Sequence, residues 1–154
     1  MKKNISLLLL MNMTFVILML TQGCEKNNET IISNYNGDES HNMGENCMEC
    51  HKTSGKGEGV FKVAGTVYDS LLINTKKNGT VRLYSGPDLS GSLIATIEVD
   101  GKGNFFTTES IDFIDEVYVS ITGSSGDRHD MISSISSGQC NSCHGVTTDK
   151  IWVK

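Results

Sequence analysis

The fold is decided by residues 80–108, which read TVRLYSGPDLSGSLIATIEVDGKGNFFTT. Three runs rich in β-branched and aromatic residues occupy 80–85, 92–99 and 104–108, and turn-forming residues, GPD at 86–88 and DGKG at 100–103, separate them. Short alternating runs bounded by Gly, Pro, Asn and Asp are typical of antiparallel strands joined by tight turns. The stretch therefore predicts part of an antiparallel sandwich or barrel.

Two further runs extend this pattern outward, at 60–68 and 116–122. The chain of 154 residues has 16 Gly and one Pro, a composition that favours a loop-rich β domain over a helix bundle. We therefore expect a mainly β fold, a Greek-key antiparallel β-sandwich over 60–122, flanked by loop-rich segments.

The same region resembles the carboxypeptidase regulatory-like domain, a small transthyretin-like sandwich. The resemblance is carried by VAGTVYD at 63–69, GTVRLY at 79–84, IEVDGKGNF at 97–105 and VYVSI at 117–121. Such domains generally have no catalytic residues of their own. The resemblance thus implies a scaffold, and the function must come from a site outside it.

Two copies of a CxxCH motif lie on either side of the expected sandwich, at Cys47, Cys50 and His51 and at Cys140, Cys143 and His144. This is the attachment motif of c-type haem. Two thiols at this spacing can add to the two vinyl groups of one porphyrin, and the following histidine can then bind the iron. The motifs predict two covalently attached haem c groups, with His51 and His144 as iron ligands.

The same cysteines allow three uses other than haem attachment. A zinc ion could be held by both CxxC pairs, although zinc does not require a histidine after each pair. Two structural disulfides would leave both histidines without a role. A thioredoxin-like redox site needs a βαβ context that the sequence lacks.

The sixth ligand of each iron must come from few candidates. Beyond the motifs, the chain has only His41 and His129 as histidines, and each lies upstream of one CxxCH. This placement favours bis-histidine ligation of both irons, with either histidine serving either haem. Met43 or Met131 is the alternative thioether donor, because Met48 lies inside the first motif and cannot readily reach the distal face. An open sixth position is the remaining alternative.

Residues 1–23 have the pattern of an export signal, with Lys2 and Lys3 before an apolar run at 5–20. LTQGC at 20–24 resembles a bacterial lipobox, with Thr21 where Leu is usual. This resemblance implies that Cys24 is lipidated and attaches the mature chain to the membrane, as an outer-membrane lipoprotein facing the periplasm or the cell surface. An uncleaved anchor is the alternative, although the run is shorter than the roughly 20 residues that span a bilayer.

The remaining segments follow from these assignments. We expect a flexible tether at 24–40, a first haem-binding segment at 41–59 and a second at 123–154, with GKGEG at 55–59 as a hinge. Trp152 could pack on a porphyrin face or belong to a final strand at the edge of the sandwich.

The arrangement as a whole resembles small exported dihaem c-type cytochromes of the Bacteroidota type. It implies a carrier of electrons between envelope redox proteins; a haem-bearing sensor or binding module, or an accessory subunit of a redox complex, is the alternative. The sequence has no nucleophile elbow, HExxH motif or phosphate-binding glycine loop, so we expect no enzyme. A net charge of -5, more negative once Lys2 and Lys3 are removed, argues against a nucleic-acid partner.

Overall fold

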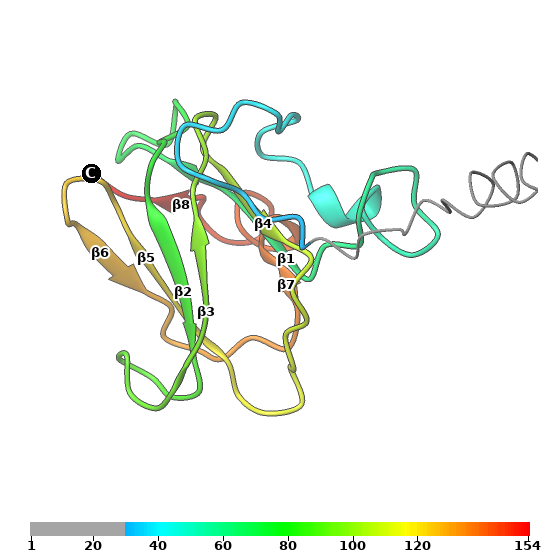
Figure 1. The fold of residues 1–154 in the computed structure, drawn as a ribbon. Coiled ribbons are helices and arrows are strands. Elements are labelled where there is room, and N and C mark those ends of the chain that lie inside the picture. The colour runs from blue at the N-terminus through cyan, green and yellow to red at the C-terminus, as the bar shows by residue number, and fades with distance from the viewer. Residues whose placement is uncertain (1–29) are drawn as a thin grey trace, which may run out of the picture.

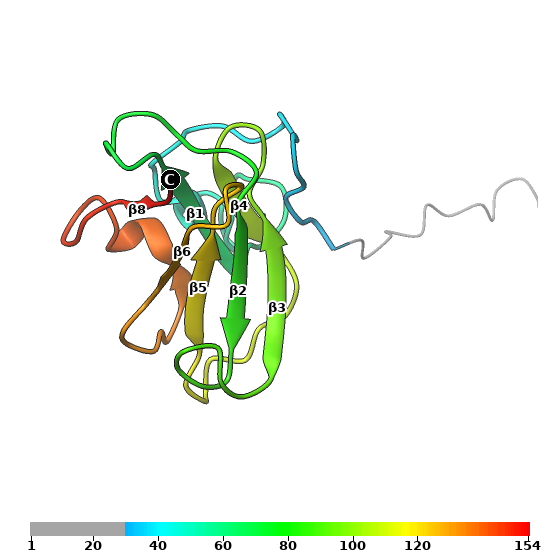
Figure 2. The same ribbon diagram turned by 90° about the vertical axis from the view of Figure 1, so that its left-hand side faces the viewer.

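The computed structural model describes residues 30–154, which form two four-stranded sheets. Figure 2 shows the sheet that contains β2, β3 and β5 in front, with β1 and β4 of the other sheet behind it. The first sheet contains β1 (Val63–Tyr68), β4 (Asn104–Thr107), β7 (Gly138–Gln139) and β8 (Ile151–Trp152). The second sheet has the order β3 (Leu93–Glu98), β2 (Thr80–Tyr84), β5 (Tyr118–Thr122) and β6 (Arg128–Asp130). The expectation of a mainly β sandwich is confirmed.

The described residues contain no helix that is both long and apolar enough to cross a membrane. The expected signal peptide and Cys24 lie outside the described residues.

Alternation along β2 produces the inner face of the second sheet. Val81 and Leu83 are almost fully buried, and they stand in register with Ile97 and Ala95 on β3. On its other side β2 pairs antiparallel with β5. Because β5 returns to β2 rather than to β4, the chain makes the crossover that a Greek key requires.

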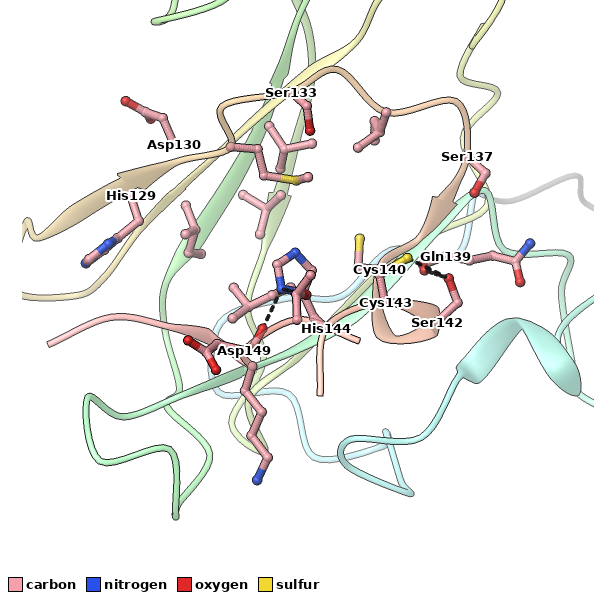
Figure 3. A pocket seen from close by; sticks show the side chains of 18 of the residues that line it. His129, Asp130, Ser133, Ser137, Gln139, Cys140, Ser142, Cys143, His144 and Asp149 are labelled. Carbon is pink, nitrogen blue, oxygen red and sulfur yellow. Dashed lines mark hydrogen bonds between the residues drawn. The ribbon is translucent and has the colours of Figure 1, made fainter. Parts of the chain in front are cut away.

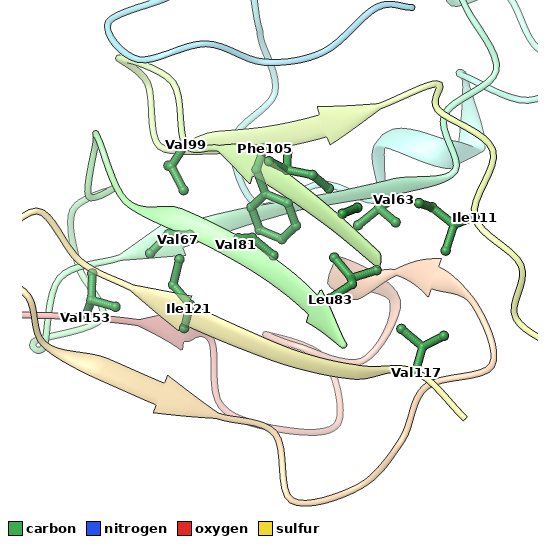
Figure 4. Close-up of a cluster of buried hydrophobic side chains, with 12 residues drawn as sticks. Val63, Val67, Val81, Leu83, Val99, Phe105, Ile111, Val117, Ile121 and Val153 are labelled. Carbon is green, nitrogen blue, oxygen red and sulfur yellow. The ribbon is translucent and has the colours of Figure 1, made fainter. Parts of the chain in front are cut away.

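β1 is buried along its whole length. Val63 and Val67 join the hydrophobic core between the sheets, together with Phe105 from β4 (Figure 4). Figure 1 shows the segment around the short 3-10 helix η1 (Cys47–Glu49) on the side of the first sheet that faces away from β2 and β3. The strand is therefore covered on one side by the second sheet and on the other by the first CxxCH segment and by Asn141 of the second motif.

The sheets extend beyond the range 60–122 that the sequence predicted. β6, β7 and β8 all come from the segment 123–154, and β7 and β8 both pair in parallel with β1. Val153 is fully buried in the core. These strands are two or three residues long, so they carry no readable alternation, and their few apolar side chains nevertheless complete the core.

Part of the expected tether is also packed. Ile32 forms an antiparallel bridge with Thr107, and Ser33 is buried, its hydroxyl donating to the Glu98 carbonyl at 2.6 Å. This short extended segment covers the edge of β4 that β1 leaves open, which protects the sheet from pairing with another chain.

The burial of Val153 predicts that the second haem-binding segment stabilises the sandwich. Val153→Ala should lower the free energy of unfolding by about 2 kcal/mol, because it removes two buried methyl groups and leaves a cavity. Ile132→Ala, in the same segment but at a fully exposed position, should change it by less than about 0.5 kcal/mol. Denaturant unfolding of the two variants measures the difference, and equal effects would show that the segment does not belong to the core.

Candidate functional site

The two CxxCH motifs fold into the same turn. The first cysteine of each begins a 3-10 helix, η1 in the first motif and η2 (Cys140–Ser142) in the second. The carbonyl of Cys47 accepts from the backbone N–H of His51 at 3.0 Å, and the carbonyl of Cys140 accepts from that of His144 at 3.0 Å. This turn keeps the two cysteines and the histidine of each motif close together in space.

Each motif histidine is oriented by a backbone carbonyl. Nδ1 of His51 lies 2.7 Å from the carbonyl oxygen of Glu58, and Nδ1 of His144 lies 2.7 Å from that of Asp149. A carbonyl can only accept, so Nδ1 carries a proton in both rings, and in the neutral imidazole Nε2 is then the nitrogen with the free lone pair. Metal-bound histidines are typically held in this way. The donor chemistry and orientation of both rings thus fit an iron ligand.

The loop at 55–59, expected to be a hinge, is instead a tight wrap around His51. The N–H of Gly57 donates to the Cys50 carbonyl at 2.9 Å, and the N–H of Phe61 donates to the His51 carbonyl at 3.0 Å. A Cβ on Gly57 would lie 2.6 Å from Nδ1 of His51, so only glycine lets the loop pass this close to the ring. The Gly-rich composition reflects close packing rather than flexibility.

Each motif opens into its own cavity. We call the first the N-terminal cavity; its volume is about 940 Å³ and its lining includes Cys47, Cys50 and His51. The C-terminal cavity, about 680 Å³, is lined by Cys140, Cys143 and His144 among others (Figure 3). Both volumes fall in the roughly 300–1,000 Å³ range of small-molecule and cofactor sites.

The two cavities differ in their walls. The N-terminal cavity is bounded mainly by loops, with Asn104 and Phe106 of β4 also in its wall. Four glutamates, Glu39, Glu45, Glu49 and Glu58, line it against one lysine, Lys56. The C-terminal cavity enters the open side of the sandwich, and apolar side chains of both sheets line it: Val81, Phe105, Val119, Ile121, Ile151 and Trp152. One cavity is therefore acidic and peripheral, whereas the other reaches the core.

His41 lies beside His51 in the N-terminal cavity, with the ring centroids 6.0 Å apart. A metal–imidazole bond is about 2 Å long and the centroid lies about 1 Å further on, so imidazoles on opposite sides of one metal ion have centroids about 6 Å apart. Phe61 stacks on the His51 ring, with the two centroids 4.0 Å apart and the rings nearly parallel. The spacing of the two histidines fits a pair of axial ligands.

His129 has a different environment. Its Nε2 donates to Oδ2 of Asp127 at 2.9 Å, and its ring packs against Trp152 with the centroids 4.1 Å apart. The hydrogen bond from His129 lowers the pKa of the Asp127 carboxyl. His129 and Trp152 both line the C-terminal cavity. Trp152 is also the last residue of β8, so it belongs to a final strand and lies at the edge of the cavity that holds the second motif.

Asn141 joins the two motifs, although it occupies a variable position inside CxxCH. Its buried side-chain amide accepts from the N–H of Thr66 at 3.1 Å and donates to the Glu45 carbonyl at 2.9 Å. The Thr66 hydroxyl in turn accepts from the N–H of Gly44 at 2.9 Å. Both motifs are thus fastened to the centre of β1. Nothing in the sequence distinguishes Asn141 as the linking residue.

Gly65 of β1 leaves room for the second motif. A Cβ at this position would lie 2.5 Å from Cζ of Phe105 and 2.9 Å from Cβ of Cys140. Any larger residue would require Phe105 or the first cysteine of the second motif to shift. The absence of a side chain at Gly65 in β1 thus allows η2 to pack closely against the strand.

The four described cysteines are free thiols, so the disulfide alternative has no support in the structure. Within residues 30–154 no three His, Cys, Asp or Glu side chains lie close enough to share a metal ion, which also leaves the zinc alternative unsupported. Comparison with family models, curated proteins and solved structures finds no match to the chain.

Burial raises the pKa of the Cys140 thiol to about 12. We therefore predict that Cys140 in the haem-free protein reacts with iodoacetamide at least tenfold more slowly than Cys143, the exposed cysteine of the same motif. The thiolate is the reactive form, and roughly one Cys140 thiol in 10,000 would be ionised at pH 8. The rate at Cys140 should rise as the pH approaches 12.

Mass spectrometry of peptides after timed alkylation at several pH values measures these rates. Equal modification of Cys140 and Cys143 at pH 8 would mean that the second motif is not packed against β1.

Proposed function

We propose that the protein is a dihaem c-type cytochrome that carries electrons in the cell envelope. The observation that supports this most directly is the duplication of a complete site. Each CxxCH lies in a separate cavity of suitable volume, and each motif histidine has its Nδ1 fixed by a backbone carbonyl at 2.7 Å. A chance CxxCH would have no reason to acquire either feature twice.

The residues have distinct roles in this proposal. Cys47 and Cys50 hold one haem by thioether bonds, and Cys140 and Cys143 hold the other. His51 and His144 bind the irons through Nε2, and their carbonyl partners keep the rings from rotating and increase the basicity of the ligand nitrogen. Each haem, when bound, supplies a one-electron iron couple.

His41 is the proposed sixth ligand of the first haem. Its 6.0 Å ring separation from His51 supports this role, because little movement is then needed to bring both imidazoles onto one metal ion. An iron with two protein ligands has no open position for a small molecule. This favours electron transfer over the sensor alternative for the first site.

The cellular setting remains a prediction from the sequence. Lipidation of Cys24 would attach the chain to the outer membrane, and envelope redox proteins would be its electron donor and acceptor. The role of the sandwich would then be to hold the two haems in a fixed arrangement, without an enzymatic activity of its own.

The first test of this proposal is haem content. Protein expressed with the haem-attachment machinery should carry two covalent haems per chain, measured by the pyridine haemochrome assay and by haem staining of denaturing gels. Cys47→Ala/Cys50→Ala and Cys140→Ala/Cys143→Ala should each retain one haem. Met48→Ala, a change inside the motif that spares both thiols, should retain two. A wild-type protein without covalent haem would contradict the function.

The second test concerns His41. Replacing His41 with Ala removes one axial ligand, so one of the two haems should become high-spin and bind carbon monoxide. Low-temperature electron paramagnetic resonance and carbon monoxide difference spectra measure both changes. Met43→Leu, a half-exposed neighbour in the same arm, should leave the spectra as in wild type. Unchanged low-spin signals in His41→Ala would exclude His41 as a ligand.

A further inference from the structure

Two candidate ligands for the second iron lie on the same wall of the C-terminal cavity. His129 is in β6, opposite Ile121 of β5, and Met131 continues the strand with its N–H donating to the Val119 carbonyl at 2.8 Å. Residues two apart on a strand share a face. His129 and Met131 accordingly both line the cavity that contains Cys140, Cys143 and His144.

His129 is committed to a structural contact. Asp127 accepts from Nε2 of His129 at 2.9 Å and, with the same oxygen, from the backbone N–H of Lys154 at 3.0 Å. His129 thus helps to fasten the end of the chain to the turn before β6, and Trp152 covers its ring. Figure 3 shows His129 at the rim of the cavity with its ring turned away from His144. Binding iron through Nε2 would break this arrangement.

We propose that the thioether of Met131, rather than His129, is the sixth ligand of the second iron. This inference rests on the proposed function. In Figure 3 one ring nitrogen of His144 is bonded to Asp149, and the other points into the interior of the cavity. Met131 borders that interior from a wall of Val119, Ile121 and Ile135. A thioether is an uncharged, flexible donor that such an apolar wall accommodates without desolvating a polar group.

The consequence is an unsymmetrical pair of haems. Histidine–methionine ligation gives a higher reduction potential than bis-histidine ligation. Four glutamates and one lysine, Lys56, line the N-terminal cavity, and Glu49 is paired with Lys52; two aspartates and one lysine, Asp130, Asp149 and Lys150, line the C-terminal cavity. The larger excess of negative charge around the first haem acts in the same direction, because negative charge favours the oxidised, more positive iron. Because the second haem then has the higher reduction potential, electrons would enter at the first haem and pass to the second.

The test uses the full-length protein carrying both haems. Oxidised wild type should show the weak far-red absorption band of methionine-ligated ferric haem, and a redox titration should resolve two one-electron waves. Met131→Leu, which keeps the volume of the side chain, should abolish the band and make one haem high-spin while covalent haem stays at two per chain. Met131→His should restore a low-spin spectrum without the band and lower only the upper wave.

The matched variants separate the two candidates. Met43→Leu and His129→Ala should both keep the far-red band. A wild type without the band would overturn the assignment. Loss of a low-spin signal in His129→Ala but not in Met131→Leu would also overturn it, and would return His129 to the role that the sequence suggested. The wild-type spectrum decides even if a variant fails to fold. Absence of covalent haem would instead refute the proposed function, and the haemochrome assay distinguishes that result.

Discussion

Burial of β1 on both sides is the constraint on which the rest of the molecule depends. One side of the strand supplies Val63 and Val67 to the core between the sheets, and the other supplies Thr66, whose backbone N–H and hydroxyl both bond to the side chain of Asn141. Because these polar groups are buried, leaving one unpaired would cost about 1–3 kcal/mol. The interaction therefore stabilises the fold and fixes the position of the second motif in the same step. Asn141 also donates to the carbonyl of Glu45, and this hydrogen bond connects the segment of the first motif to the same network.

The identical turns of the two motifs show how much of a site local geometry can build. In each, a 3-10 turn presents the cysteines, and a following loop returns a carbonyl to the histidine Nδ1 at 2.7 Å. The loops themselves are unrelated: the first uses glycines at 55–59, and in the second the Cys143 carbonyl accepts from the N–H groups of Thr147 and Thr148. The common feature is thus a hydrogen-bond requirement and not a sequence. This requirement is what a metal-binding imidazole imposes, since the ring must present one nitrogen and protect the other.

The sequence predicted the five central strands closely and the later ones poorly, for a physical reason. The runs at 80–85 and 104–108 alternate over enough residues to reveal a buried face, and β2 and β4 follow them. Gly138–Gln139 is too short to alternate, and it becomes a strand only because β1 offers a free edge beside it. The motif residues could be singled out because CxxCH has a fixed spacing that is visible in the sequence, whereas Asn141 and Gly57 could not, since their roles arise from contacts with Thr66 and His51 that form only in the folded chain. His41 became a candidate ligand because few histidines lie outside the motifs. Its distance from His51 depends on how the chain folds between His41 and Cys47, and no motif specifies that distance.

Placing one motif before the sandwich and one after it gives the two sites different surroundings. The first segment precedes the strands of the described chain, and its cavity is formed mostly by loops, with Glu39 and Glu58 in its lining and Asn104 and Phe106 of β4 as the part of its wall that the sheet supplies. The second motif lies between β7 and β8, and its cavity is consequently lined by residues of both sheets, with Val81 and Phe105 of the inner faces in its wall. A charged group near iron has a weaker effect in a solvated loop than in an apolar cavity, because water screens it. The order of the segments along the chain therefore allows the same five-residue motif to produce two chemically different environments within one domain.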